Sequence, residues 1–143
     1  MPEGVEVEYP IEVEWEGGMR WRGGAAGGPT HLVDGAREAA PTPVDALVVA
    51  LASCSAIDVV EYLEKRRTPP ASMSVSVRFS RAPGHPRRLT DAHLTYRLAT
   101  ASSREHVERA VQLSLERYCT VAGSLAPDTR LGWTIELQPA PET

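Results

Sequence analysis

Residues 43–65 read PVDALVVALASCSAIDVVEYLEK, and this segment predicts one long helix. Thr42 is placed to cap its start, Pro43 suits the first helical position, and Asp45 follows three residues after the cap. The helix then runs through the basic residues 65–67 to the Thr-Pro-Pro sequence at 68–70, which stops it. We therefore expect a helix of about 24 residues.

This helix needs cover on every side, because Asp45 is the only polar residue between Val44 and Ala52. One small sheet covers a single side. We therefore expect a second subunit to pack over the rest, in an obligate, two-fold, intertwined homodimer. The alternative is that a second helix and the ends of the sheet suffice.

Strands flank the predicted helix on both sides. Alternating apolar residues predict a hairpin with one solvated face, which turns at Gly17-Gly18, and a short third strand at 31–33 follows the Gly-rich sequence at 23–30 and ends at Asp34-Gly35. A second hairpin and a last strand follow the helix. The alternating residues are Val5, Val7, Tyr9, Ile11, Val13, Trp15, Met19 and Trp21, then Met73, Val75, Val77, Phe79, Leu94, Tyr96 and Leu98, and finally Leu131, Trp133, Ile135 and Leu137.

A second helix is predicted between the last two strands. Ser102 and Glu105 form a capping box, and an apolar stripe with helical spacing extends from Val107 to Tyr118. The element order is β-β-β-α-β-β-α-β, which predicts an α+β fold with mostly antiparallel pairing and one domain over residues 1–143.

Composition narrows the classes of function. The net charge of −4 argues against nucleic acid or anionic lipid as the main partner. No apolar run approaches the ~20 residues of a membrane span, and the acidic start lacks the features of a secretion signal. We expect a cytoplasmic protein, in which two cysteines are free and chemically active rather than a structural disulfide.

Cys54 lies about eleven residues into the first helix, too far from its start for the helix dipole to lower the thiol pKa. As a nucleophile it needs a cation from elsewhere, and the candidates upstream are Arg20, Arg22 and Arg37. The alternative is that Cys54 is a small core residue. Asp58, one turn further on, could orient a cation together with Glu61, although a solvated or ion-paired helix face is the simpler interpretation.

Cys119 follows the last turn of the second helix, where Arg117 is the nearest charge. A thiol at such an edge is accessible to a partner, and the alternative is again a small apolar helix end. The four histidines are scattered without a cysteine or second histidine at metal spacing, so a zinc site is not expected. A Cys-His hydrolase would need a histidine brought to Cys54 by the fold.

The two cysteine segments, PVDALVVALASCSAIDVVEYLEK and AVQLSLERYCTVAGSL, resemble the two cysteine blocks of OsmC-like proteins. That family includes osmotically inducible and organic hydroperoxide resistance proteins. The resemblance extends over the whole chain in element order and in the spacing of the cysteines. It implies an intertwined homodimer in which two long central helices are wrapped by sheets from both subunits, with active sites at the interface.

The resemblance also implies a thiol peroxidase. Cys54 would attack an organic hydroperoxide and become a sulfenic acid, Cys119 would resolve it as a disulfide, and a dithiol such as a lipoyl group would reopen the bridge. Arg37 or Arg20 would activate Cys54, with Arg22 equally placed, and no metal or organic cofactor is required. An apolar wall would favour organic hydroperoxides over hydrogen peroxide. This wall is expected from Leu47, Val48, Leu51 and neighbouring strands.

The chain departs from the better understood branches, which carry a Glu ten residues before the first cysteine, where this chain has Val44. Asp45 is adjacent but points about 100° away along the helix, so it is not an evident substitute. The SCSAIDVV sequence at 53–60 matches a less characterised branch. The alternative function is therefore a non-enzymatic redox sensor or apolar-ligand-binding module on the same fold, and a purely structural disulfide is a third interpretation.

Overall fold

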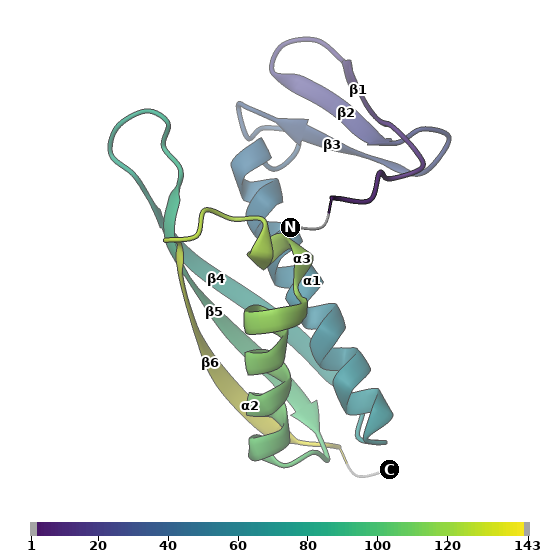
Figure 1. Cartoon of the computed structure of the whole chain (residues 1–143), viewed down its shortest axis with the longest axis vertical. Coiled ribbons are helices and arrows are strands. Elements are labelled where there is room, and N and C mark those ends of the chain that lie inside the picture. The colour runs from purple at the N-terminus through teal and green to yellow at the C-terminus, as the bar shows by residue number, and fades with distance from the viewer. Residues whose placement is uncertain (1–2, 142–143) are drawn as a thin grey trace. The chain divides into compact units, whose positions relative to one another are not determined.

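The computed structural model describes residues 3–141 and confirms the predicted mixed α+β fold and element order (Figure 1). Contacts divide the chain into two compact units, a first that ends at Leu47 and a second that begins at Val48. The elements are β1 (Ile11–Trp15), β2 (Arg20–Ala25), β3 (Thr30–Asp34), α1 (Pro43–Lys65), β4 (Ser72–Arg81), β5 (Leu89–Thr100), α2 (Arg104–Leu113), the π-helical turn η1 (Ser114–Tyr118), α3 (Thr120–Gly123) and β6 (Arg130–Pro139).

The first unit contains an antiparallel sheet in the order β1-β2-β3. The predicted turn is confirmed, since Gly17 and Gly18 both adopt positive φ angles between β1 and β2. Two boundaries differ from the prediction. Strand β1 begins only at Ile11, and β2 continues into the Gly-rich sequence, where Gly24 lies so close to the carbonyl of Pro29 that a Cβ atom would collide with it.

Both faces of this first sheet are exposed in the chain, which corrects the prediction of a single solvated face. All five residues of β1 are exposed, and Ile11 and Trp15 each keep 64% of their surface. Asp34 is the only buried residue described between residues 3 and 47. Three short strands with no second layer within their own unit leave their apolar side chains to solvent or to a partner.

The second unit holds the core. Its sheet has the order β4-β5-β6, with β4 antiparallel and β6 parallel to β5. Because parallel neighbours need a crossover, α2 connects β5 to β6 and lies against the sheet (Figure 1). The core joins α1, β5 and α2. Its most buried members are Leu51, Val59 and Leu63 of α1, Leu94 and Tyr96 of β5, and Val107 and Val111 of α2.

Helix α1 matches its prediction closely and has 23 residues. The Thr42 hydroxyl accepts a hydrogen bond from the Asp45 amide at 3.0 Å, as an N-cap does. At the other end Arg67 adopts a positive φ of 61°, and the Thr68 amide donates to the Leu63 carbonyl, so the helix ends before the two prolines.

The hydropathy of α1 corrects the expectation that no segment is apolar enough to span a membrane. Its length and composition would allow it to cross a membrane, since its mean hydropathy over an 18-residue window is 1.8. The few polar residues in that window do not lower this average enough to exclude it. Core helices of soluble proteins pass the same test. Here one face of α1 is buried in the core, including Leu51, Val59 and Leu63. Val49 and Ile57 remain 59% and 57% exposed, so part of the helix lacks cover within the chain.

Helix α2 begins one residue later than predicted. Its cap is Ser103, whose hydroxyl accepts from the His106 amide, while Ser102 is buried against Thr100. The predicted apolar stripe is correct up to Ser114 and wrong at Tyr118, which is 62% exposed. The cause is η1, a π-helical turn that takes one extra residue and so rotates everything after it.

Candidate active site

The structure brings the two cysteines into contact within the second unit. Cys54 lies half-buried on α1, and Cys119 follows η1 as the N-cap of α3, with 5% of its surface exposed. Both are free, and Cys54 is one of the groups whose interaction raises the pKa of the Cys119 thiol, so the two side chains lie near each other. The two thiols are therefore candidates for forming a disulfide with each other.

The pKa of the Cys119 thiol is raised to about 11, mainly by burial and also by its interactions with Cys54, while hydrogen bonds from the amides of Ala122 and Val121 lower it. Cys119 is thus a protonated thiol at neutral pH. Its burial corrects the prediction of an accessible thiol at a helix edge, because η1 turns Cys119 inward. The more exposed sulfur, Cys54, is the one that an external reagent reaches first.

A buried chain of hydroxyl groups lies in the same part of the molecule. The Ser55 hydroxyl is 2.6 Å from the Tyr96 hydroxyl and 3.0 Å from that of Ser114, and Ser114 also donates to Asp58 Oδ2 at 2.8 Å. Burial raises the pKa of Tyr96 to about 12, with smaller contributions from Cys119 and Asp58, against the Ser55 hydrogen bond, which lowers it.

Sequence reasoning missed three of these four residues. Asp58 was considered, but as part of a solvated or ion-paired helix face, and the structure instead shows it accepting a hydrogen bond from Ser114. Glu61 is exposed. The usable signal was Ser114, a polar residue in the middle of an apolar stripe, since a buried hydroxyl requires a partner.

The predicted cations lie in the first unit, each beside a carboxylate. Arg37 makes a two-pronged contact with Asp45, with Nε 2.8 Å from Oδ2 and Nη2 3.0 Å from Oδ1. This hydrogen bond from Arg37 is the main reason that the pKa of Asp45 is lowered. Arg20 lies 3.4 Å from Asp34 and 3.7 Å from Glu38, and Arg22 pairs with Glu16 at 2.8 Å.

The Arg37–Asp45 contact bears on the departure at Val44. Asp45 is not an evident substitute for the Glu of other branches, because it points about 100° away from Val44 on the helix. That argument fixes the direction of Asp45 but not that of its partner. Arg37 comes from the loop before α1, with a positive φ of 56°, and so reaches the carboxylate where the helix places it.

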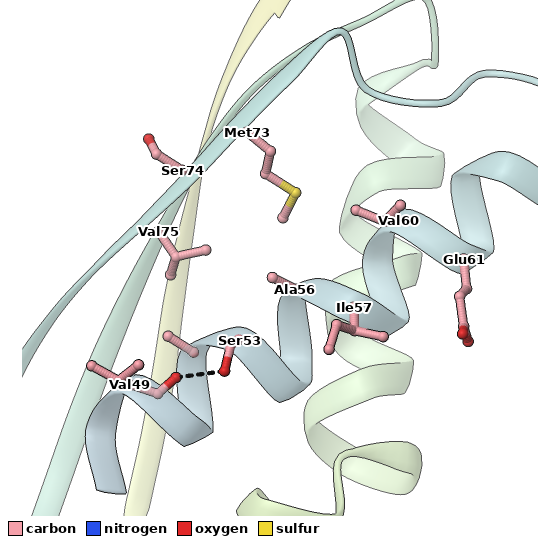
Figure 2. Close-up of a pocket in the computed structure, with 10 residues that line it drawn as sticks. Val49, Ser53, Ala56, Ile57, Val60, Glu61, Met73, Ser74 and Val75 are labelled. Atoms are coloured by element: carbon pink, nitrogen blue, oxygen red, sulfur yellow. Dashed lines mark hydrogen bonds between the residues drawn. The ribbon is translucent and has the colours of Figure 1, made fainter. Parts of the chain in front are cut away.

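An apolar groove runs along α1 where it faces the start of β4 (Figure 2). Its volume is about 570 Å³. Cys54 does not line it, although the neighbouring Ser53 does, with its hydroxyl turned onto the Val49 carbonyl at 2.8 Å. The lining is mostly apolar and includes Val49, Ala52, Ala56, Ile57 and Val60 of α1 and Met73 and Val75 of β4.

The predicted apolar wall lies elsewhere. Val48 and Leu51 point into the core, with 7% and 0% of their surfaces exposed, so they cannot line an open pocket. Leu47 is 40% exposed and belongs to the first unit. The apolar surface that is open to a ligand or a partner is the opposite part of α1, which carries Val49 and Ile57.

Comparison with known proteins decides the family. A family model described as OsmC-like protein matches residues 35–134, which include both cysteines. The chain belongs to the OsmC-like family. Protein YhfA of Escherichia coli K12 is 36% identical over 112 residues, covering 77% of this chain and 84% of that protein.

Solved structures agree with this assignment. A crystal structure of a protein from Aquifex aeolicus VF5 superposes with a TM-score of 0.84 at 25% identity, covering 96% of this chain and 100% of the other. An organic hydroperoxide resistance protein OsmC from Legionella pneumophila has a TM-score of 0.68 at 12% identity, with 93% and 99% covered. The second likeness shows the OsmC fold alone.

Proposed function

We propose that this OsmC-like protein is a thiol-dependent peroxidase that reduces organic hydroperoxides, with Cys54 as the nucleophile and Cys119 as the resolving thiol. The observation that carries the proposal is the pair of neighbouring free thiols, one half-buried and one buried. Membership of the OsmC-like family supports a peroxide-related redox role. The Legionella protein of the same fold is itself named for organic hydroperoxide resistance.

The reaction has three balanced steps. The Cys54 thiolate attacks the distal oxygen of the hydroperoxide, an S–O bond forms, the O–O bond breaks, and the alkoxide leaves as an alcohol after taking up a proton. The Cys119 sulfur then attacks the Cys54 sulfenic acid, a disulfide forms, and water leaves with the thiol proton. A dithiol, such as a lipoyl group, reduces the disulfide and becomes a disulfide itself.

The exposure of the two cysteines determines which sulfur the reductant attacks in the last step. Because Cys119 is buried and Cys54 is not, the reductant attacks the Cys54 sulfur and Cys119 leaves as the thiol. Arg37, held by Asp45, or Arg20, held by Asp34, supplies the positive charge that favours the Cys54 thiolate. No metal or organic cofactor takes part in these steps.

The proposal includes a two-fold, intertwined homodimer with its active sites at the interface. Support comes from apolar side chains that the single chain leaves open, on α1, along the groove beside it and on the first sheet. The mostly apolar groove also favours an alkyl or lipid hydroperoxide over hydrogen peroxide. We further propose a cytoplasmic location, and the net charge of −4 argues against nucleic acid or membrane partners.

The test is steady-state consumption of cumene hydroperoxide by the purified protein with dihydrolipoamide, beside hydrogen peroxide. We expect many turnovers, faster with the organic peroxide. Cys54→Ser should abolish turnover, and Cys119→Ser should limit the protein to one equivalent without disulfide formation. Ser80→Ala is the matched control, since Ser80 is an exposed serine on β4 that does not line the groove. Multiple turnovers by Cys54→Ser would refute the proposal.

A non-enzymatic redox sensor or apolar-ligand-binding module is the second candidate. Two observations favour it. Val44 stands where better understood branches have Glu, and no hydrogen bond joins a cation to Cys54 among residues 48–141. A sensor would consume a single equivalent of peroxide, form the Cys54–Cys119 disulfide and stop even with dithiol present. A binding module would consume none.

A further inference from the structure

We propose that Ser114 and Asp58 act as a latch that holds the η1 turn open in its π-helical form and thereby keeps Cys119 against Cys54. These two are positioning residues, since neither touches the reacting sulfur of Cys54 in the steps above. The inference rests on the proposed function only in that both use the same pair of thiols.

The π-helical form of η1 determines which residue faces the core. The buried residues of α2 repeat at helical spacing up to Ser114, and an unbroken α-helix would next bury Tyr118. Instead the Cys119 amide donates to the Ser114 carbonyl at 2.8 Å, five residues back. As a result Tyr118 is 62% exposed and Cys119 only 5%.

Returning η1 to an α-helical turn would undo this placement. One residue of a helix corresponds to a rotation of about 100°, so Tyr118 would turn inward and Cys119 would turn away from α1. The turn therefore has two discrete forms, and only the π-helical one presents the resolving thiol. Single π-helical turns within helices are rare and occur often at functional sites.

Ser114 is the first residue of this turn and is bound from three directions. Its hydroxyl lies 2.8 Å from Asp58 Oδ2, 3.0 Å from Ser55 Oγ and 3.4 Å from the Ser55 carbonyl. A hydroxyl has one proton, and an ionised carboxylate can only accept, so Ser114 donates to Asp58. The Ser55 hydroxyl lies between the Ser114 hydroxyl at 3.0 Å and the Tyr96 hydroxyl at 2.6 Å.

The three hydroxyl groups thus form one chain of hydrogen bonds that ends on the Asp58 carboxylate. Ser55, Tyr96 and Ser114 are at most 1% exposed, so water does not compete for their protons. Hydrogen bonds to a charged acceptor are about twice as strong as neutral ones. The link from Ser114 to Asp58 is therefore the strong one, and the Ser55 and Tyr96 links support it.

The other end of the latch lies on the part of α1 that carries Cys54. Ser55 is the next residue along the chain, and Asp58 is one helical turn further, on roughly the same face as Cys54. Binding Ser114 to these two residues fixes the start of η1 relative to Cys54. The hydrogen bond from the Cys119 amide to the Ser114 carbonyl then fixes Cys119 relative to Ser114.

The reduction potential of the Cys54–Cys119 pair measures this effect. Without the latch, the π-helical form is less populated and the Cys119 thiol is less often beside Cys54. We expect Ser114→Ala to lower the equilibrium constant for disulfide formation roughly tenfold, the size expected for a lost charge-assisted hydrogen bond. That raises the reduction potential by about 30 mV.

The experiment equilibrates the purified full chain in glutathione buffers of stepped ratio and quantifies the Cys54–Cys119 disulfide by mass spectrometry after alkylation. Asp58→Ala should match Ser114→Ala. Asp58→Asn keeps an acceptor oxygen and should recover part of the potential. Tyr96→Phe leaves the Ser114 to Asp58 link intact, so it should lower the melting temperature while keeping the wild-type potential. Ser80→Ala, at an exposed position of β4 outside the groove, is the control.

Wild-type potentials in both Ser114→Ala and Asp58→Ala would overturn the inference, and so would equal shifts in Tyr96→Phe. If Ser114→Ala does not fold, the Asp58 variants decide. No peroxide is used, so the proposed function is tested separately. A latch-dependent potential without peroxide turnover supports the inference and refutes the peroxidase. Turnover with potentials insensitive to the latch does the reverse, and a wild-type chain that forms no bridge refutes both.

Discussion

The two units of the chain differ in whether their apolar residues are buried or exposed. In the second unit, α1, β5 and α2 bury a shared core, with Leu51, Leu94 and Val107 fully inaccessible. In the first unit, Asp34 is the only buried residue described, and every residue of β1 is exposed. A unit that leaves Ile11 and Trp15 in water stabilises itself poorly, so its strands require cover that they do not supply themselves.

The same division separates the chemical groups. Both sulfurs and the hydroxyl chain belong to the second unit, which therefore assembles the thiol chemistry by itself. The candidate cations Arg20 and Arg37 belong to the first unit, where each is paired with a carboxylate. The self-contained unit thus holds the reacting atoms, and the incomplete unit holds the charges proposed to tune them.

Matched truncations of the two apolar surfaces should give the largest contrast. Leu94→Ala and Ile11→Ala remove the same number of carbons, from a fully buried and a 64% exposed side chain. Leu94→Ala should cost about 2–5 kcal/mol of unfolding free energy at every protein concentration. Ile11→Ala should cost under about 0.5 kcal/mol in the monomer and more in a dimer that covers the sheet. Urea unfolding followed by circular dichroism at several protein concentrations measures both.

The contrast fails if Ile11→Ala costs as much as Leu94→Ala and the cost does not change with protein concentration. That result would mean that the first sheet is buried within its own chain. A cost that rises with assembly would instead support the proposed homodimer.

Substitutions of the candidate cations should have the next largest effect, on kcat/KM. Arg37→Gln should lower kcat/KM for cumene hydroperoxide roughly a hundredfold if this guanidinium stabilises the Cys54 thiolate, and Asp45→Asn about tenfold, because the amide keeps one acceptor but loses the charge. Arg88→Gln, which loses a surface pair with Asp128, is the control and should change the rate less than about twofold.

The same assay, applied also to Arg20→Gln, shows whether Arg20 or Arg37 activates Cys54. A large loss in Arg20→Gln with wild-type activity in Arg37→Gln would transfer the role to Arg20. Wild-type rates in both variants would mean that neither cation acts on Cys54.

Most of the fold was predictable because periodicity reports burial. The alternation in β4, β5 and β6, the cap at Thr42 and the apolar run of α1 each matched an element. The parallel pairing of β6 did not follow from these patterns, since it depends on where α2 returns the chain. The exposure of the first sheet was also not predictable, because alternation shows which residues share a face and not what covers it.

The candidate site was less predictable, for two physical reasons. The π-helical turn changes the spacing by one residue, and a stripe from Val107 to Tyr118 looks the same with or without it. The Arg37–Asp45 contact depends on the path of the loop before α1, so a helix-face argument from Val44 could not predict it. The cysteines were recognisable from their segments, whereas Ser55, Tyr96 and Ser114 were recognised only once their hydroxyl groups were seen in contact.

Asp34 provides a smaller test, based on pH. Its carboxylate accepts hydrogen bonds from the amides of Ala39, Ala36 and Glu38, and these, with Ala39 the largest, hold its pKa below the ordinary 3.8 despite burial. A lowered pKa in the folded state contributes stability above pH 3.8, which is lost as the pH falls through the lower folded value.

Asp34→Asn should therefore lower the melting temperature by roughly 3 °C at pH 7, and the difference from wild type should shrink as the pH drops below 3.8. Asp128→Asn, which loses an exposed pair with Arg88, is the control. Thermal unfolding from pH 7 to pH 3 measures both variants. A difference that stays constant down to pH 3 would show that the Asp34 charge does not contribute to stability.

Surface ion pairs should show the smallest effect, equal in both units. Arg22 with Glu16 in the first unit and Arg97 with Glu136 in the second are all at least 40% exposed at the side chain. Exposed pairs contribute ~0–1 kcal/mol and weaken in salt. Double-mutant cycles of both pairs at low and high salt should give coupling energies that agree within about 0.5 kcal/mol. A much stronger coupling for Arg22 with Glu16 would mean that this pair is shielded from water, and the first sheet would then be covered in solution by something that the single chain does not provide.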